Sequence, residues 1–165
     1  MKRTIILAVT VLLTALLQTT FCDFLSVASI KPNLPVILTA SFALMCGRRS
    51  AALIGFCTGM ALDLISAGTP GFYALIYTWV GYLTGYSYRI FYDDDIKTPL
   101  LLIGGADLMY GLYQYVSTFL IRGRIHFFFY LGRIMLPEMI YTIILAVPLY
   151  QLLYRMNRKL TVSYF

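Results

Sequence analysis

The sequence GFCTGMALDLISAGTPG, from Gly55 to Gly71, places a small or short residue at every fourth position. Gly55, Gly59, Asp63 and Ala67 would therefore form one narrow stripe on a helix. A stripe of small residues lets the backbone of another helix approach closely. The stretch predicts a helix that ends shortly after Asp63 and packs tightly against a neighbour.

Asp63 is the ionisable residue of this stretch, and its setting is unfavourable for a charge. A carboxylate inside an apolar run needs a compensating partner, and the helix dipole disfavours negative charge near a C-terminus. One solution is structural: Thr69 caps the next helix, Pro70 is its first residue, and Asp63 accepts hydrogen bonds from its free N–H groups. A functional role for the carboxylate is the alternative.

The composition indicates an integral membrane protein. Of the 165 residues, 60% are hydrophobic and 12% are charged, which is more apolar surface than a soluble domain of this length can bury. Residues 1–165 are expected to form one membrane domain. The net charge of +6 does not indicate nucleic-acid binding, because Lys and Arg lie at the ends of apolar runs. The three cysteines lack metal-ligand spacing and are expected to be free thiols.

The apolar runs predict an all-α bundle of about six transmembrane helices. The expected spans cover approximately residues 4–22, 34–46, 51–66, 71–91, 98–121 and 129–154. The first lacks a small-residue cleavage site and is expected to remain as a span rather than to be removed as a signal peptide. The second, about 20 Å long as a helix, is short for a core of about 30 Å. It either borrows flanking residues, thins the bilayer or turns back as a re-entrant hairpin.

The basic residues predict the orientation of the chain. With six spans and a cytoplasmic N-terminus, nine of the 13 would face the cytoplasm: Lys2, Arg3, Arg48, Arg49, Arg89, Lys97, Arg155, Arg158 and Lys159. The other four would lie outside: Lys31, Arg122, Arg124 and Arg133. Because cytoplasmic loops carry the excess of Lys and Arg, both termini are expected in the cytoplasm.

Four ionisable residues lie within or at the edge of the expected spans, namely Asp63, Asp107, Arg133 and Glu138. Asp63 and Arg133 both fall near the outer end of the bundle, where an ion pair would compensate two buried charges. Arg133 can instead extend to the membrane interface. Asp107 and Glu138 are candidates for a proton or substrate path, although the spans supply few further polar residues.

Nothing in the sequence predicts catalysis. It contains no Ser-His-Asp arrangement, no HExxH, no phosphate-binding glycine loop and no tethered metal ligands. The acidic triplet at residues 93–95 is interpreted as a solvated loop, since three consecutive carboxylates do not easily converge on one metal ion. We therefore expect no catalytic residue, metal or cofactor. The candidates for a partner-binding or structural role are Gly55, Gly59, Asp63, Arg133 and Glu138.

Several short motifs follow one another in a recognisable order. They are Lys31-Pro32-Asn33-Leu34, Gly55-Phe56-xx-Gly59-xxx-Asp63-xx-Ser66, Gly68-xx-Gly71, Gly81-Tyr82-Leu83-xx-Gly85, Leu136-Pro137-Glu138 and Leu149-Tyr150. With the chain length and the basic ending, this order resembles the MreD family, the small membrane subunit of the bacterial rod-shape (elongation) machinery. The resemblance covers roughly residues 30–90 and 131–158. One position departs from it, because the asparagine common about five residues after the proline is Thr142 here.

The resemblance implies a non-catalytic scaffold in the bacterial cytoplasmic (inner) membrane. MreD proteins associate with MreC, a single-span protein with a large periplasmic domain. Through MreC they connect to the MreB filament, the RodA glycosyltransferase and its penicillin-binding transpeptidase partner. The family's fold is similar to the substrate-binding S-components of energy-coupling-factor vitamin transporters. That similarity implies an alternative function, a small-molecule capture subunit with a pocket near the outer helix ends.

The two functions make different demands on the sequence. A capture subunit needs several polar groups converging on one cavity, and Asp63, Arg133 and Glu138 are the candidates for them. A docking subunit presents small-residue faces toward lipid, and the step from Gly55 to Gly59 has this character. The helix that approaches these glycines can also belong to the same chain.

Overall fold

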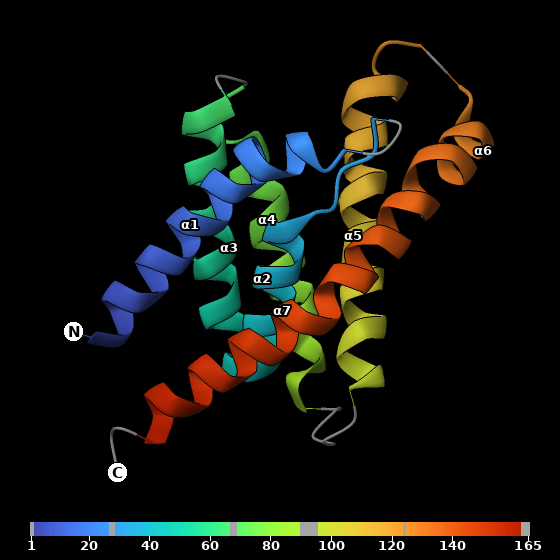
Figure 1. The fold of residues 1–165 in the computed structure, drawn as a ribbon. Coiled ribbons are helices and arrows are strands. Elements are labelled where there is room, and N and C mark those ends of the chain that lie inside the picture. Colours follow the sequence, from blue (N-terminus) through green and yellow to red (C-terminus); the bar gives the residue numbers. More distant parts are fainter. Residues whose placement is uncertain (1, 27–28, 67–68, 90–95, 124, 163–165) are drawn as a thin grey trace.

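The computed structural model describes residues 2–26, 29–66, 69–89, 96–123 and 125–162. These ranges hold helices and no strand, so the expected all-α class is confirmed (Figure 1). The elements are α1 (Lys2–Phe24), α2 (Leu34–Cys46), α3 (Arg48–Ser66), α4 (Phe72–Tyr86), η1 (Ser87–Arg89), α5 (Lys97–Tyr115), η2 (Val116–Leu120), α6 (Phe127–Tyr130), η3 (Leu131–Met135) and α7 (Leu136–Val162). The segments η2 and η3 are single π-helical turns that continue the neighbouring α-helices.

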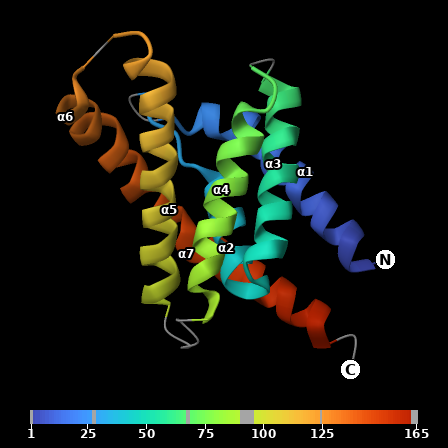
Figure 2. The ribbon, with the colours of Figure 1, turned by 180° about the vertical axis from the view of Figure 1, so that it is seen from behind.

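The helices lie in three layers. α3, α4 and α5 stand side by side in the layer nearest the viewer in Figure 2, while α1 and α7 slope across the opposite face in Figure 1. α2 lies between these layers and contacts all five helices. The N-terminal and C-terminal ends of the chain lie at the same end of the bundle (Figure 1).

The central helix α2 is apolar on every side, and nine of its 13 residues are buried. Asn33 caps its first turn, Pro35 occupies a position where no N–H bond is lost, and Gly47 ends it with a φ of 80°. The chain runs into α2 through a non-helical segment in which Pro32 and Asn33 are buried. The short helix and its buried entry segment lie inside the bundle, and α3 returns beside α2 (Figure 1). Which of the three alternatives applies in a bilayer stays a prediction.

The turn between α3 and α4 differs from the sequence prediction. Thr69 was expected to cap the helix and Pro70 to begin it, but α4 begins at Phe72 after Gly71. Gly71 has a φ of 88°, a left-handed conformation that glycine adopts without strain. The prediction was wrong because the capping oxygens come from Asp63 on the preceding helix, not from the side chain of Thr69.

Three of the described helices are long and apolar enough to cross a membrane: Thr4–Phe24, Arg48–Ser66 and Phe127–Lys159. Among the ends that differ from the expected spans, α3 already includes Arg48 and α7 continues past Arg155 and Lys159. Arg and Lys are good helix formers and are favoured near a C-terminus, so basic residues extend the last helix rather than end it. The membrane crossings themselves, of these three and of the other helices, remain a prediction.

Candidate functional site

Asp63 lies in the last turn of α3, and its carboxylate faces the beginning of α4. Oδ2 accepts hydrogen bonds from the backbone N–H groups of Gly71 at 2.9 Å and Ala74 at 3.1 Å. Oδ1 accepts a third bond, from Tyr73 N–H at 3.0 Å. N–H groups at a helix start have no partner within the helix, and the helix dipole favours negative charge there. The hydrogen bonds expected of a structural acceptor are therefore present.

The glycines of α3 pack against α4 of the same chain. A Cβ atom on Gly55 would overlap the backbone carbonyl of Tyr77, and one on Gly59 would overlap the Cα of Ala74. The contact is reciprocal, since a Cβ on Gly81 of α4 would overlap the carbonyl of Ala51 in α3. This close backbone approach supports internal packing of the two helices rather than a docking face of Gly55 and Gly59.

Arg133 does not compensate Asp63. Arg133 is exposed in η3, and its guanidinium carbon lies 5.5 Å from the ring centroid of Phe129. Across the described ranges, the ion pair found joins Lys31 and Asp23. The predicted pair between Asp63 and Arg133 is wrong, because backbone N–H groups already satisfy Asp63, and Arg133 lies on the surface of the bundle.

A polar cavity of about 530 Å³ lies where α1 and α3 end and α4 begins, at the end of the bundle opposite the chain termini (Figure 1). Its walls come from α1, the segment before α2, α3, α4, α5 and the run from α6 to α7. The polar side chains that line it include Gln18, Lys31, Asn33, Tyr77, Gln114 and Glu138. Of the five candidates for a partner-binding or structural role, Glu138 is the one that lines this cavity. Asp63 and Arg133 do not.

Two amide side chains hold the non-helical segment that borders the cavity. Gln18 of α1 donates from Nε2 to the Pro32 carbonyl at 3.1 Å and accepts at Oε1 from the Leu34 N–H at 2.9 Å. Asn33 donates from its backbone N–H to Thr142 Oγ1 of α7 at 3.2 Å. Backbone groups outside a helix must be satisfied inside the protein at membrane depth. Side chains of α1 and α7 therefore make this irregular segment possible.

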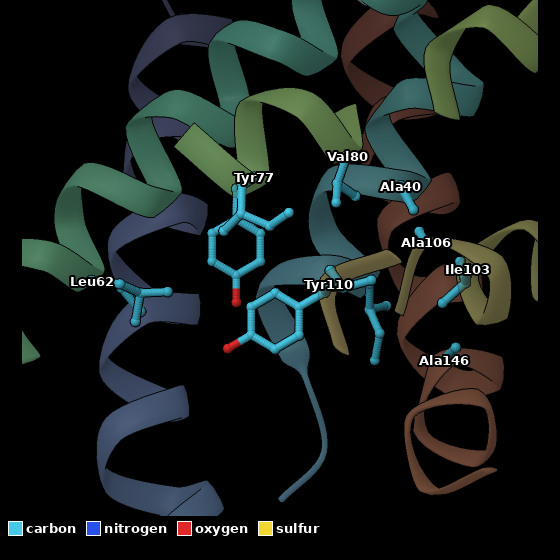
Figure 3. Close-up of a cluster of buried hydrophobic side chains, with 12 residues drawn as sticks. Ala40, Leu62, Tyr77, Val80, Ile103, Ala106, Tyr110 and Ala146 are labelled. Carbon is cyan, nitrogen blue, oxygen red and sulfur yellow. The ribbon is translucent and has the colours of Figure 1, made fainter. Parts of the chain in front are cut away.

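Tyr77 joins the cavity to the core. Its hydroxyl donates to Asn33 Oδ1 at 3.0 Å, and its ring stacks on that of Tyr110 with centroids 5.5 Å apart and planes 16° apart. Figure 3 shows the two rings from different helices, with both hydroxyl groups pointing to the same side. Beyond the rings lie small and aliphatic side chains, among them Val80, Ile103 and Ala146. The cavity thus opens on one side of an apolar core.

Asp107 and Glu138 belong to the same region. Asp107 is 3% exposed and faces Asn33 and Thr142, and Asp107 and Glu138 are close enough to interact electrostatically. Asp107 Oδ1 and Asn33 Nδ2 are both buried, and neither has a hydrogen-bond partner within the described ranges. The structure therefore brings together the two carboxylates that were candidates for a polar path.

Comparison with known proteins decides the family. A protein-family model described as rod shape-determining protein MreD matches residues 1–160 of the 165-residue chain. The chain belongs to the MreD family. Membership supports a role in the determination of rod shape, and with the apolar helices it indicates a membrane protein. No curated protein and no solved structure matches the chain.

The MreD motifs now have positions in the fold. The motif from Lys31 to Leu34 forms the irregular cavity wall, and the glycine motifs form the contact between α3 and α4. The position that departs from the family retains a polar contact, because the hydroxyl oxygen of Thr142 accepts a hydrogen bond from the backbone N–H of Asn33. A threonine here replaces an amide without leaving that N–H unsatisfied.

Sequence reasoning missed several residues of the cavity. Gln18 is the one amide side chain in the first apolar run. A polar amide inside the membrane is unfavourable unless it has hydrogen-bond partners, and this was the available signal. Tyr110 offered no such signal, since aromatic residues are common throughout the chain. Its part in the cavity wall depends on stacking with Tyr77, which is 33 residues away in sequence (110 − 77).

Proposed function

We propose that this MreD-family protein is a non-catalytic scaffold of the cell-elongation (rod) complex that docks MreC. Through MreC it would link the MreB filament to RodA, to the partner transpeptidase and hence to lateral peptidoglycan synthesis. The protein would be a multi-pass component of the bacterial cytoplasmic membrane, with about six crossings and both termini in the cytoplasm. The match of the MreD family over residues 1–160 carries this proposal.

The geometry of the interior supports a structural role. The carboxylate of Asp63 is occupied by three backbone N–H groups, and the glycine stripe is occupied by α4. The carboxylate and the glycine stripe are thus both engaged in contacts within the chain, which leaves neither of them open to a substrate or a partner protein. The proposal therefore places MreC on a surface other than the one formed by Gly55 and Gly59.

The charge distribution supports the proposed orientation. Both chain ends lie on one side of the bundle (Figure 1), as an even number of crossings requires. A hollow lined by Arg48, Arg49 and Tyr88 lies where α2 ends and α3 begins, toward the same end of the bundle (Figure 1). Basic residues gathered beside the termini are typical of the cytoplasmic side of a membrane protein.

Affinity purification tests the scaffold. The tagged full-length chain is extracted from its host membrane in mild detergent, and co-purifying proteins are identified by mass spectrometry. We expect enrichment of MreC over a tagged multi-pass membrane protein of the same host that serves as the control. Recovery of MreC at the level of that control would contradict the proposal.

The polar cavity favours a second candidate function, a capture subunit for a small molecule. Gln18, Asn33 and Glu138 converge on one hollow, which is the arrangement that a capture subunit requires. The same purified preparation separates the two functions. Extraction of a stoichiometric small molecule without MreC supports capture, whereas MreC without such a molecule supports the scaffold.

A further inference from the structure

The cavity holds a carboxyl group that its own residues leave without a counter-ion. Glu138 lines it, and within the described ranges the Glu138 carboxyl group has neither an ion pair nor a hydrogen-bond partner. Asp107 lies nearby as a second, buried carboxyl group. A carboxylate removed from water is costly until a cation or a proton neutralises it.

Lys31 and Arg133, two cationic side chains in the described part of this end of the bundle, are not paired with Glu138. Lys31 lines the cavity, but its ammonium group is paired with Asp23. Arg133 lies five residues before Glu138 (138 − 133) and is exposed over the ring of Phe129. Among the described residues, Glu138 therefore remains the cavity carboxyl without a cationic partner.

Four tyrosines from three parts of the chain also line the cavity: Tyr73, Tyr77, Tyr110 and Tyr130. Tyr77 stacks with both Tyr73 and Tyr110, with centroid distances of 6.3 Å and 5.5 Å. Phenol oxygens accept hydrogen bonds from ammonium groups, and ring faces that stacking leaves uncovered attract cations. Rings combined with an unpaired carboxylate are a setting that favours ammonium groups and disfavours anions.

We propose that this cavity binds an organic ammonium group, with Glu138 as its counter-ion and the tyrosines around it. A volume of about 530 Å³ exceeds that of a bare ion and admits the carbon skeleton that carries the amine. The ammonium belongs either to a free amine or to the aminoalcohol headgroup of a lipid. The proposal rests on the cavity alone and is independent of the docking of MreC.

The first experiment uses ethanolamine as the probe of ammonium binding. The purified full-length chain is titrated with ethanolamine hydrochloride in detergent at constant ionic strength, and the melting temperature is followed. Ethylene glycol, which has a hydroxyl in place of the amine, is the neutral control. Ethanolamine is expected to raise the melting temperature, because a ligand that binds the folded state stabilises it. Ethylene glycol is expected to leave it unchanged.

Two variants connect this stabilisation to the cavity. Glu138→Gln keeps the size of the side chain and removes its charge, so the apparent Kd for ethanolamine is expected to rise at least about tenfold. Arg133→Gln changes an exposed charge on the same helical run and should retain the wild-type Kd. If Glu138→Gln does not fold, Ser66→Trp takes its place. Ser66 is exposed and lines the cavity, so an indole there fills the hollow without disturbing the core.

The second experiment identifies the source of the ammonium. Wild-type and Glu138→Gln chains are placed in nanodiscs of phosphatidylglycerol with or without phosphatidylethanolamine, and the lipids retained are measured by native mass spectrometry. Phosphatidylethanolamine retained by the wild type and lost in the variant assigns the site to the lipid headgroup. Stabilisation by ethanolamine without this lipid dependence assigns it to a free amine. The proposal is overturned if neither probe binds, or if both bind equally well to the variant.

Discussion

The carboxylate of Asp63 and the backbone N–H of Ala74 are joined by a 3.1 Å hydrogen bond across the turn from α3 to α4. Asp63 belongs to the C-terminal turn of one helix, where negative charge is unfavourable, yet its carboxylate lies at the N-terminus of the next, where negative charge is favourable. The short turn ending at Gly71 brings these two helix ends together. Asp63, whose charge is unfavourable in the sequence context alone, therefore stabilises the helical hairpin of α3 and α4.

The first prediction concerns the three hydrogen bonds that the Asp63 carboxylate accepts. Asp63→Leu removes all three acceptor contacts and leaves the buried N–H of Ala74 unsatisfied, at about 1–3 kcal/mol. The part-buried N–H groups of Gly71 and Tyr73 lose their partner at a smaller cost. Asp63→Asn keeps one oxygen, which can serve Gly71 and Ala74, and loses the bond to Tyr73. We expect the asparagine variant to retain more folded protein than the leucine variant. Membrane abundance and melting temperature in detergent measure this, and equal loss in both variants would show that the charge itself is required.

The second prediction concerns Thr142, which accepts the N–H of Asn33. Thr142→Val keeps the shape of the side chain and removes the acceptor, so a loss of about 1–3 kcal/mol is expected from the unsatisfied N–H. Thr78→Val is the matched control, because the hydroxyl of Thr78 only bonds back to the Ala74 carbonyl within α4. The control should lose less stability. A Thr142→Val chain as stable as the control would show that this hydrogen bond does not stabilise the fold.

The sequence predicted the helical class, the short second helix and the structural acceptor, because each depends on local pattern. Residues 34–46 are the same in the prediction and in the structure. Asp63 was recognised because a charge in an apolar run requires a partner within reach. These features are encoded within a few helical turns.

The cavity could not be predicted in the same way. It depends on Gln18, Asn33, Tyr110 and Glu138, which are far apart in sequence and converge only when the helices cross. The predicted pair of Asp63 and Arg133 failed for the same reason, since similar depth in the membrane does not specify which helix faces are opposite. Side-chain partners between helices follow from packing angles that apolar periodicity leaves open.

The third prediction is topological. Reporters fused after Lys159 are expected to be cytoplasmic, and reporters inserted at residues 122–126 are expected to be external. The excess of Lys and Arg on the expected cytoplasmic side and the common side of both chain ends are the reasons. Paired phosphatase and fluorescent-protein fusions at each site provide the measurement. An external C-terminus would contradict six crossings and favour five with one re-entrant segment.

The fourth prediction separates internal packing from docking at the glycine stripe. Gly59→Ala adds one methyl group where the Cα of Ala74 already lies. Since backbone atoms of α4 cannot move aside as a flexible side chain would, overpacking should cost about 1–3 kcal/mol. We expect a lower melting temperature in detergent and lower abundance in the membrane, and Gly59→Leu should lower both further.

Gly105→Ala provides the matched control for this substitution. Gly105 is an exposed glycine within α5, and a Cβ there meets nothing within 4 Å. Because alanine is a better helix former than glycine, the control should be neutral or stabilised by up to about 1 kcal/mol. If Gly59 only packs internally, each Gly59 variant should lose MreC in proportion to its loss of folded protein. A Gly59→Leu chain that melts like the wild type but no longer retains MreC would instead make the stripe a docking face.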